Sequence, residues 1–310
     1  PDGRLTGAKI LTTDTTTATY LFQSVTETTG TDKYTFSIFV KKGDTDTVAL
    51  RFQTNYPDRS DVVFVFSTAS FETQSTGGSI SVTSNKIVAY QDGWFRIELT
   101  IQAVSGNSTV QGYIRPRVSS GVVDATDTGT SFCYVWGGQM EESAFATSVI
   151  PTSDLQVTRS QDTCTGGGSS SIFNDSEGTL FVEISRPIND STTRSVSISD
   201  GSSSDRVVIQ YISGNILGIV ASNTSSLQTF VFSTTSTSLN KIAIRYKKND
   251  FAMYVNGTQA GTDTNGNAPV GLSSFDFNDG TGSQKYEGKC AQAMYFDTAL
   301  TNAELTTLTT

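Results

Sequence analysis

Short runs in which apolar and polar side chains alternate one by one recur along the whole chain. Residues 34–40 read Tyr-Thr-Phe-Ser-Ile-Phe-Val, and residues 95–101 read Phe-Arg-Ile-Glu-Leu-Thr-Ile. A period of two turns one side of an extended chain toward a core and the other toward water. Turn residues such as Asp92–Gly93 separate the runs, because glycine accepts a positive φ. The pattern therefore predicts an all-β fold built from short strands.

The chain is long enough for two such bodies. It has 310 residues, and a domain takes about 150 residues on average. Residues 166–171 read Gly-Gly-Gly-Ser-Ser-Ser, a composition typical of a flexible linker. We therefore predict two tandem jelly-roll-like β-sandwiches, at residues 1–160 and 172–310, joined by a linker at residues 161–171. A short helix is expected at the C-terminus.

Charge and hydropathy argue against several classes of partner. The formal net charge is −9, whereas nucleic acids and anionic lipid surfaces are bound through clustered Lys and Arg. No apolar run approaches the roughly 18 residues that a membrane-spanning helix requires. We expect neither nucleic-acid binding nor membrane insertion.

The sequence offers little for catalysis. It contains no histidine, which excludes Ser-His-Asp and Cys-His nucleophilic systems and histidine-ligated metals. A glycosidase would need two carboxylates about 5–9.5 Å apart across a sugar. The obvious acids, Glu98, Glu183 and the adjacent Glu141–Glu142, are expected to be solvated surface groups. We therefore expect a protein that is not an enzyme.

One stretch has the composition of a calcium loop. Asp276, Asn278 and Asp279 precede Gly280 and offer three oxygen-bearing side chains, which are the ligands that Ca²⁺ prefers. The same composition is typical of ordinary turns. Both interpretations stay open, and Ca²⁺ is the one cofactor considered.

Sugar binding would require an exposed aromatic ring beside groups that hydrogen-bond hydroxyls. Two groups of this kind are present: Tyr56 with Asp58 and Arg59, and Tyr113 with Arg115 and Arg117 on the outward side of a predicted strand. These six residues are the candidate ligand contacts. The two tryptophans, Trp94 and Trp136, lie beside alternating runs, and we expect them in the core.

A family resemblance covers the first half of the chain. Residues 136–152 read WGGQMEESAFATSVIPT. This run resembles the ending of carbohydrate-binding-module-like β-sandwiches in bacteriophage tail fibres, tailspikes and other virion appendages. Val149 stands where that pattern usually has an aromatic residue. Residues 93–96, Gly-Trp-Phe-Arg, are similar to a strand of the same family.

A second resemblance covers the other half. Residues 241–258 read KIAIRYKKNDFAMYVNGT and are similar to the central hairpin of laminin-G-like, concanavalin-A-like domains. Residues 297–305 resemble the closing helix of those domains. Thr301 and Glu304 are spaced as a capping box, in which each side chain satisfies the other's free backbone N–H.

These resemblances imply that the protein is not an enzyme. They predict a non-catalytic structural and adhesion protein of a phage virion, a tail fibre or appendage that recognises a host surface glycan, contacts other virion proteins and forms a homotrimer. Two alternatives remain: a capsid decoration or head-fibre protein, and a module of a polysaccharide depolymerase.

Overall fold

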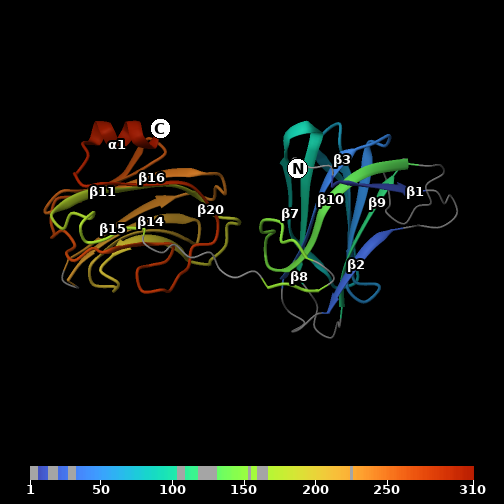
Figure 1. Ribbon diagram of the computed structural model, residues 1–310, viewed down its shortest axis with the longest axis horizontal. Coiled ribbons are helices and arrows are strands. Elements are labelled where there is room, and N and C mark those ends of the chain that lie inside the picture. The colour runs from blue at the N-terminus through green and yellow to red at the C-terminus, as the bar shows by residue number, and fades with distance from the viewer. Residues whose placement is uncertain are drawn as a thin grey trace. The chain divides into compact units, whose positions relative to one another are not determined.

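The computed structural model describes residues 6–12, 20–26, 33–102, 109–117, 131–152, 155–158, 167–223 and 226–310. The chain divides into two compact units, Pro1–Arg159 and Ser160–Thr310. Each unit is a sandwich of two five-stranded antiparallel sheets (Figure 1). The predicted all-β class, the paired sandwiches and the short C-terminal helix are confirmed. Residues 161–166 of the predicted linker lie outside the described residues.

The first unit is built from two sheets, which we name after their middle strands. The β3 sheet contains, in spatial order, β1 (Ala8–Thr12), β10 (Ser131–Glu142), β3 (Lys33–Lys42), β8 (Trp94–Gln102) and β7 (Ser81–Ala89). The β9 sheet contains β2 (Leu21–Thr26), β9 (Thr109–Arg117), β4 (Thr47–Gln53), β5 (Arg59–Val65) and β6 (Ser70–Gly77). A short 3₁₀ turn, Gln91–Gly93, precedes β8.

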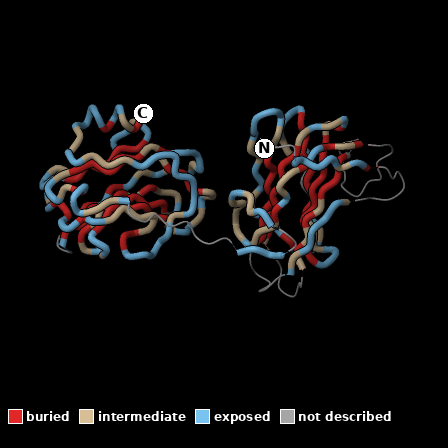
Figure 2. The backbone as a smooth tube through the Cα atoms, viewed as in Figure 1, coloured by how far each residue is buried: buried red, intermediate tan, exposed pale blue. Residues whose placement is uncertain are grey.

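The core of this unit lies between the two sheets (Figure 2). Inward side chains such as Val40, Leu50, Phe64 and Ile97 are fully or almost fully buried. Burying a side chain of this size contributes about 1.5–3 kcal/mol. The alternation seen in the sequence thus decides which side of each strand faces the partner sheet.

The two tryptophans lie outside that core, so the expectation for them was wrong. Trp136 is opposite Phe39, and Trp94 is opposite Lys41, on the outward side of the β3 sheet. A one-residue step along a strand reverses the side on which a residue lies, and Phe95 and Val135 take the neighbouring inward places.

The outward side of the β3 sheet is partly covered by the chain that follows β10. The Ser143 carbonyl accepts a hydrogen bond from Thr35 at 2.8 Å, and the Ile150 N–H donates to the side chain of Gln139 at 2.7 Å. Much of the WGGQMEESAFATSVIPT run is therefore used to fold this segment back over its own sheet.

The second unit repeats the two-sheet plan. The β16 sheet contains β18 (Thr258–Asp263), β17 (Phe251–Val255), β16 (Asn240–Lys247), β11 (Glu177–Ser185) and β20 (Lys289–Phe296). The β13 sheet contains β15 (Ser226–Ser233), β14 (Asn215–Ser222), β13 (Arg206–Ile212), β12 (Arg194–Ser199) and β19 (Ser274–Asp276).

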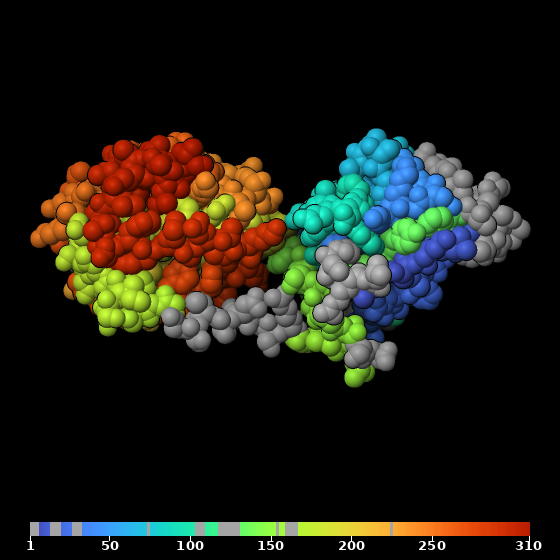
Figure 3. Space-filling model, turned by 45° about the horizontal axis from the view of Figure 1, so that its top comes forward, coloured from blue at the N-terminus to red at the C-terminus, as the bar shows by residue number. Residues whose placement is uncertain are grey.

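The helix α1 (Asn302–Thr309) covers the outward side of the β16 sheet. The predicted capping box is present, with Thr301 and Glu304 bonded reciprocally. Leu305 is buried against Phe181 and Tyr254. The helix lies beside β16 in Figure 1, and the C-terminal residues gather on the surface of this unit in Figure 3. Among the described residues, no helix has the length and hydropathy needed to cross a membrane.

Candidate ligand-binding face

The outward side of the β9 sheet brings both predicted sugar-binding groups together. Tyr113 on β9 is opposite Phe22 on β2 and Arg51 on β4, and Arg51 is opposite Asp61 on β5. Neighbouring strands lie about 4.8 Å apart, so this row of side chains spans about 14 Å. We call this surface the aromatic face and define it by Tyr20, Phe22, Arg51, Tyr56, Arg59, Asp61, Tyr113 and Arg115.

Three aromatic rings form one end of the aromatic face. The rings of Tyr113 and Phe22 are stacked, with centroids 5.2 Å apart and planes inclined by 25°. Tyr20 meets Tyr113 edge-on at 5.4 Å. Phe22 is 57% exposed. The Tyr113 hydroxyl donates to Oε1 of Gln111 at 2.7 Å, and burial raises the pKa of Tyr113, so the hydroxyl keeps its proton at neutral pH.

A buried ionic cluster holds the middle of the aromatic face. Asp61 is 0% exposed, and its two carboxylate oxygens accept hydrogen bonds from Arg51 at 2.6 and 3.0 Å. Arg59 donates to the same carboxylate at 3.1 Å. A buried charge is tolerated only when it is paired in this way. Asp61 therefore fixes the positions of two guanidinium groups on the sheet.

Tyr20 lies across the same surface. Its ring packs on Ala49 and Val63, and the guanidinium carbons of Arg51 and Arg115 lie 5.6 and 5.3 Å from the ring centroid. Such cation–π contacts contribute about 0.5–2 kcal/mol each. The aromatic rings and the arginines thus support one another.

Tyr56 stands at the other end, on the turn before β5. It is 73% exposed, and the Arg59 guanidinium lies 5.5 Å from its ring centroid. The turn is closed by hydrogen bonds between the backbones of Thr54, Asn55 and Asp58. The carboxylate of Asp58 accepts the backbone N–H of Ser79 and so stabilises the adjoining turn.

The structure thus unites most of the predicted contacts. Tyr56, Arg59, Tyr113 and Arg115 share one face, whereas Asp58 serves a neighbouring turn. Arg117 ends β9, and its side chain lies outside the described residues. A role for these residues in binding stays a prediction.

Four members of the aromatic face were not among the predicted contacts: Tyr20, Phe22, Arg51 and Asp61. Arg51 and Asp61 carried a usable signal, because each is a charged residue at an outward position of a strand that also contains several apolar residues. Tyr20 and Phe22 carried none, since their place depends on the pairing of β2 with β9.

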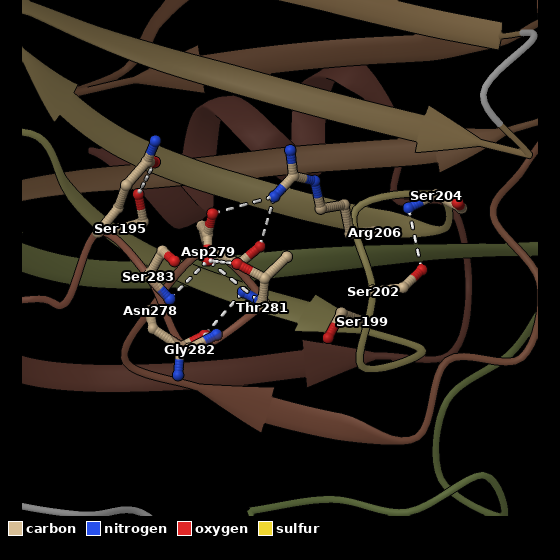
Figure 4. A network of polar contacts seen from close by, with 12 residues as sticks. Ser195, Ser199, Ser202, Ser204, Arg206, Asn278, Asp279, Thr281, Gly282 and Ser283 are labelled. Carbon is tan, nitrogen blue, oxygen red and sulfur yellow. Dashed lines mark hydrogen bonds and ion pairs between the residues drawn. The ribbon is translucent and has the colours of Figure 1, made fainter.

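Two of the three proposed calcium ligands, Asn278 and Asp279, lie in a loop that hydrogen-bonds to itself (Figure 4). The Asp279 carboxylate accepts from the backbone N–H and hydroxyl of Thr281, at 3.0 and 2.7 Å, and from the N–H of Ser283 at 3.1 Å. Burial raises the pKa of Asp279, but these bonds and Arg206 outweigh it, so the pKa is lowered overall.

The other two proposed ligands also accept hydrogen bonds from nearby residues, Asn278 within the loop and Asp276 within β19. Asn278 Oδ1 accepts from the N–H groups of Gly280 and Gly282, and Asp276 accepts from the hydroxyl of Ser274. Among the described residues, no three His, Cys, Asp or Glu side chains form a metal-binding group. Calcium binding at this loop stays a prediction, and the arrangement accounts for the loop without an ion.

One of the acids expected in solvent is buried. Glu98 is 8% exposed on the outward side of the β3 sheet, between Ser37 and Lys86 of the neighbouring strands. Burial raises the pKa of Glu98, and Lys86 and Arg96 oppose that rise. The sheet places this carboxylate on the opposite side of the sandwich from the aromatic face.

Comparisons with known proteins give no family for the chain. No protein-family model and no curated protein matches it. Solved structures with a similar fold include the CBM40 of Ruminococcus gnavus IT-sialidase bound to α2,3-sialyllactose. It is 13% identical over 45% of this chain and 85% of its own, with a TM-score of 0.39.

Two further structures are similar at the same level. A heptameric SAP-like pentraxin from Limulus polyphemus is 16% identical over 43% of this chain and 70% of its own, with a TM-score of 0.35. The binding domain of Botulinum neurotoxin serotype G is 14% identical over 45% of this chain and 38% of its own, also with a TM-score of 0.35.

Proposed function

We propose that this chain is a non-catalytic glycan-binding protein that contacts its ligand through the aromatic face of the first unit. The observation that carries the proposal is the row from Phe22 to Asp61, with Tyr56 at its far end. Aromatic rings present apolar surface to the C–H face of a sugar. The guanidinium group of Arg59, which is 21% exposed, can donate hydrogen bonds to sugar hydroxyls. Exposed aromatic surface of this kind is typical of binding sites.

The chemistry of the face favours binding over bond cleavage. A general acid must hold a proton that it can give up, and a general base needs a lone pair directed at the substrate. The carboxylate of Asp61 is saturated by Arg51 and Arg59, and that of Asp58 accepts a backbone N–H. Neither of these two carboxylates is positioned to perform such a step.

The biological setting is part of the proposal and rests on the sequence motifs. The run at residues 136–152 resembles phage appendage sandwiches, so we place the chain in a bacteriophage virion as a tail-fibre or appendage segment. There it would recognise a host surface glycan, contact other virion proteins and form a homotrimer. The Ser- and Thr-rich outward strand faces are compatible with this setting.

A glycan array combined with a reducing-sugar release assay tests the proposal. The full 310-residue chain is applied to bacterial surface polysaccharides, and free reducing ends are measured on every polysaccharide that it binds. Binding without release is the expected result. Release of sugar would contradict it and identify a depolymerase module. Absence of binding would also contradict it and favour a structural head-fibre or decoration protein.

A further inference from the structure

Four loops of the second unit line an open surface cavity of about 490 Å³. It is lined by Asp175 and Ser176 before β11, Ser222 and Asn223 at the end of β14, Lys248 between β16 and β17, and Asn267, Ala268 and Val270 between β18 and β19. Segments that are distant in the sequence therefore meet here, and the lining combines polar side chains with apolar surface.

Buried polar groups beneath the cavity fasten these loops to one another. Asp205 is 6% exposed, and its carboxylate accepts the N–H of Val270 at 2.9 Å and the N–H of Asn223 at 3.3 Å. The hydroxyl of buried Ser222 donates to the Ala268 carbonyl at 2.9 Å. Burying polar groups is costly unless they are hydrogen-bonded. The buried side chains of Asp205 and Ser222 meet this condition by bonding the backbone of the rim, and so they hold that backbone in place.

Further bonds complete the fastening. Ser226 accepts the N–H of Asn267 at 3.0 Å. The Asn249 N–H donates to the Gly266 carbonyl at 3.0 Å, and the Gly266 N–H donates to the Asn249 side chain at 3.1 Å. The Leu272 N–H donates to Asp175 at 3.2 Å. The rim is thus preorganised, which lowers the entropy cost of binding a ligand.

Four polar side chains on the rim are not used by the fold. Elsewhere in this unit, Asp190, Asp200 and Asn278 hydrogen-bond the backbone of their own turns. In contrast, the hydroxyl of Ser176, the amides of Asn223 and Asn267 and the ammonium group of Lys248 make no hydrogen bond within the described residues. Fixed backbone with uncommitted polar side chains is typical of a binding site.

We propose that this rim binds a neutral sugar unit, at a site separate from the aromatic face. Asp175 and Lys248 carry opposite charges, so the cavity favours neither an anion nor a cation. Amide and carboxylate groups match hydroxyls that both donate and accept hydrogen bonds. Ala268 and Val270 add apolar contact surface. The site lies wholly within the second unit and does not depend on the aromatic face.

Selective NMR tests this site directly. The full chain carries Phe22→Ala and Tyr56→Ala, which disable the aromatic face. It is labelled with [¹⁵N]asparagine. Glucose, galactose, mannose, N-acetylglucosamine and glucuronate are then each titrated to millimolar concentrations. We expect saturable shifts of the Asn223 and Asn267 signals with at least one of the four neutral sugars. Asn→Gln variants at these positions identify the signals.

Variants of the rim separate specific binding from general effects. Asn267→Ala and Lys248→Ala should each weaken binding about tenfold, the loss expected from one well-placed hydrogen bond. Lys285→Ala changes an exposed lysine of another loop in the same unit and should leave the affinity unchanged. Shifts with none of the neutral sugars, shifts with glucuronate alone, or an affinity insensitive to both rim variants would overturn the proposal.

Discussion

Asp61 shows how much a single buried charge can determine in this protein. It is completely buried between Arg51 and Arg59. Its loss would leave guanidinium groups without their counter-charge in a region that water does not reach freely. We expect Asp61→Ala to lower the free energy of unfolding of the first unit by about 3–5 kcal/mol, measured by chemical denaturation.

The control for Asp61 is an aspartate of the same unit in an exposed ion pair. Asp46 bonds Lys42 at 2.6 Å, and both side chains are well exposed. Asp46→Ala should therefore cost only about 0–1 kcal/mol. Equal losses for the two variants would contradict the role given to the buried cluster.

Asp190 should make the stability of the second unit decrease as the pH falls. Burial raises its pKa, but two hydrogen bonds from Arg194, at 2.6 and 3.1 Å, outweigh that effect and lower the pKa below 3.8. As the pH falls through 3.8, the unfolded chain takes up this proton before the folded chain does, so the stability contributed by Asp190 is lost.

The measurement is a series of denaturation curves from pH 6 to pH 2. The free energy of unfolding of the second unit should fall with acid more steeply in the natural sequence than in Asp190→Asn, which cannot titrate. Parallel curves for the two proteins would contradict the prediction, because they would show that the titration of Asp190 does not contribute to the stability of the folded unit.

The sequence could predict half of the aromatic face. Tyr113 and Arg115 are separated by one residue on a single strand, so alternation alone places them together. That Tyr56 and Arg59 share their face depends on pairing β9 with β4 and β4 with β5, which local patterns do not contain. The tryptophans were misplaced for a related reason, since residue type gives a preference for burial but does not decide which side of a strand is inward.

Among the elements, α1 is the one whose start follows most directly from local sequence. Its capping box involves residues three apart in the chain, so no distant contact is needed to predict it. The predicted turn at Asp92–Gly93 is likewise confirmed, by the positive φ angles of both residues. In contrast, β18 has the sequence TQAGTD, which shows no apolar alternation, and it is a strand through its pairing with β17.

The helix is expected to depend more on its packing than on its cap. Thr301→Ala removes one capping hydrogen bond and should cost about 1 kcal/mol. Leu305→Ala removes a fully buried side chain from the layer over Phe181 and should cost about 2–5 kcal/mol. Denaturation of the second unit measures both values. A larger loss for Thr301→Ala than for Leu305→Ala would contradict this order.

At the scale of the whole molecule, the cores are separate. The two main clusters of buried residues draw their members from one unit each, so each sandwich has its own source of stability. Calorimetry should therefore resolve two unfolding transitions. Asp61→Ala should lower the midpoint of one, and Leu305→Ala that of the other. A single transition shifted by both variants would contradict independent units.

The fold class was within reach of the sequence because alternation, turn residues and two family-like motifs all agreed on β-sandwiches. Function was less accessible. The net charge and the absence of histidine reduced the number of possible partners and catalytic mechanisms. However, a binding surface on a sheet is assembled from several strands, and the cavity of the second unit is assembled from four loops. Such sites depend on tertiary structure: the sequence indicated half of the aromatic face and none of the residues that line the cavity.

The central claim is that the first unit binds a glycan through its aromatic face, and the most direct test is calorimetric titration of a polysaccharide identified on the array. Phe22→Ala and Tyr56→Ala should each weaken binding about tenfold or more, as expected for aromatic anchors of an interface. Tyr134→Ala removes an exposed aromatic ring from the outward side of the β3 sheet and should leave the affinity unchanged. Unaltered binding by Phe22→Ala and Tyr56→Ala, with loss in Tyr134→Ala, would contradict the account.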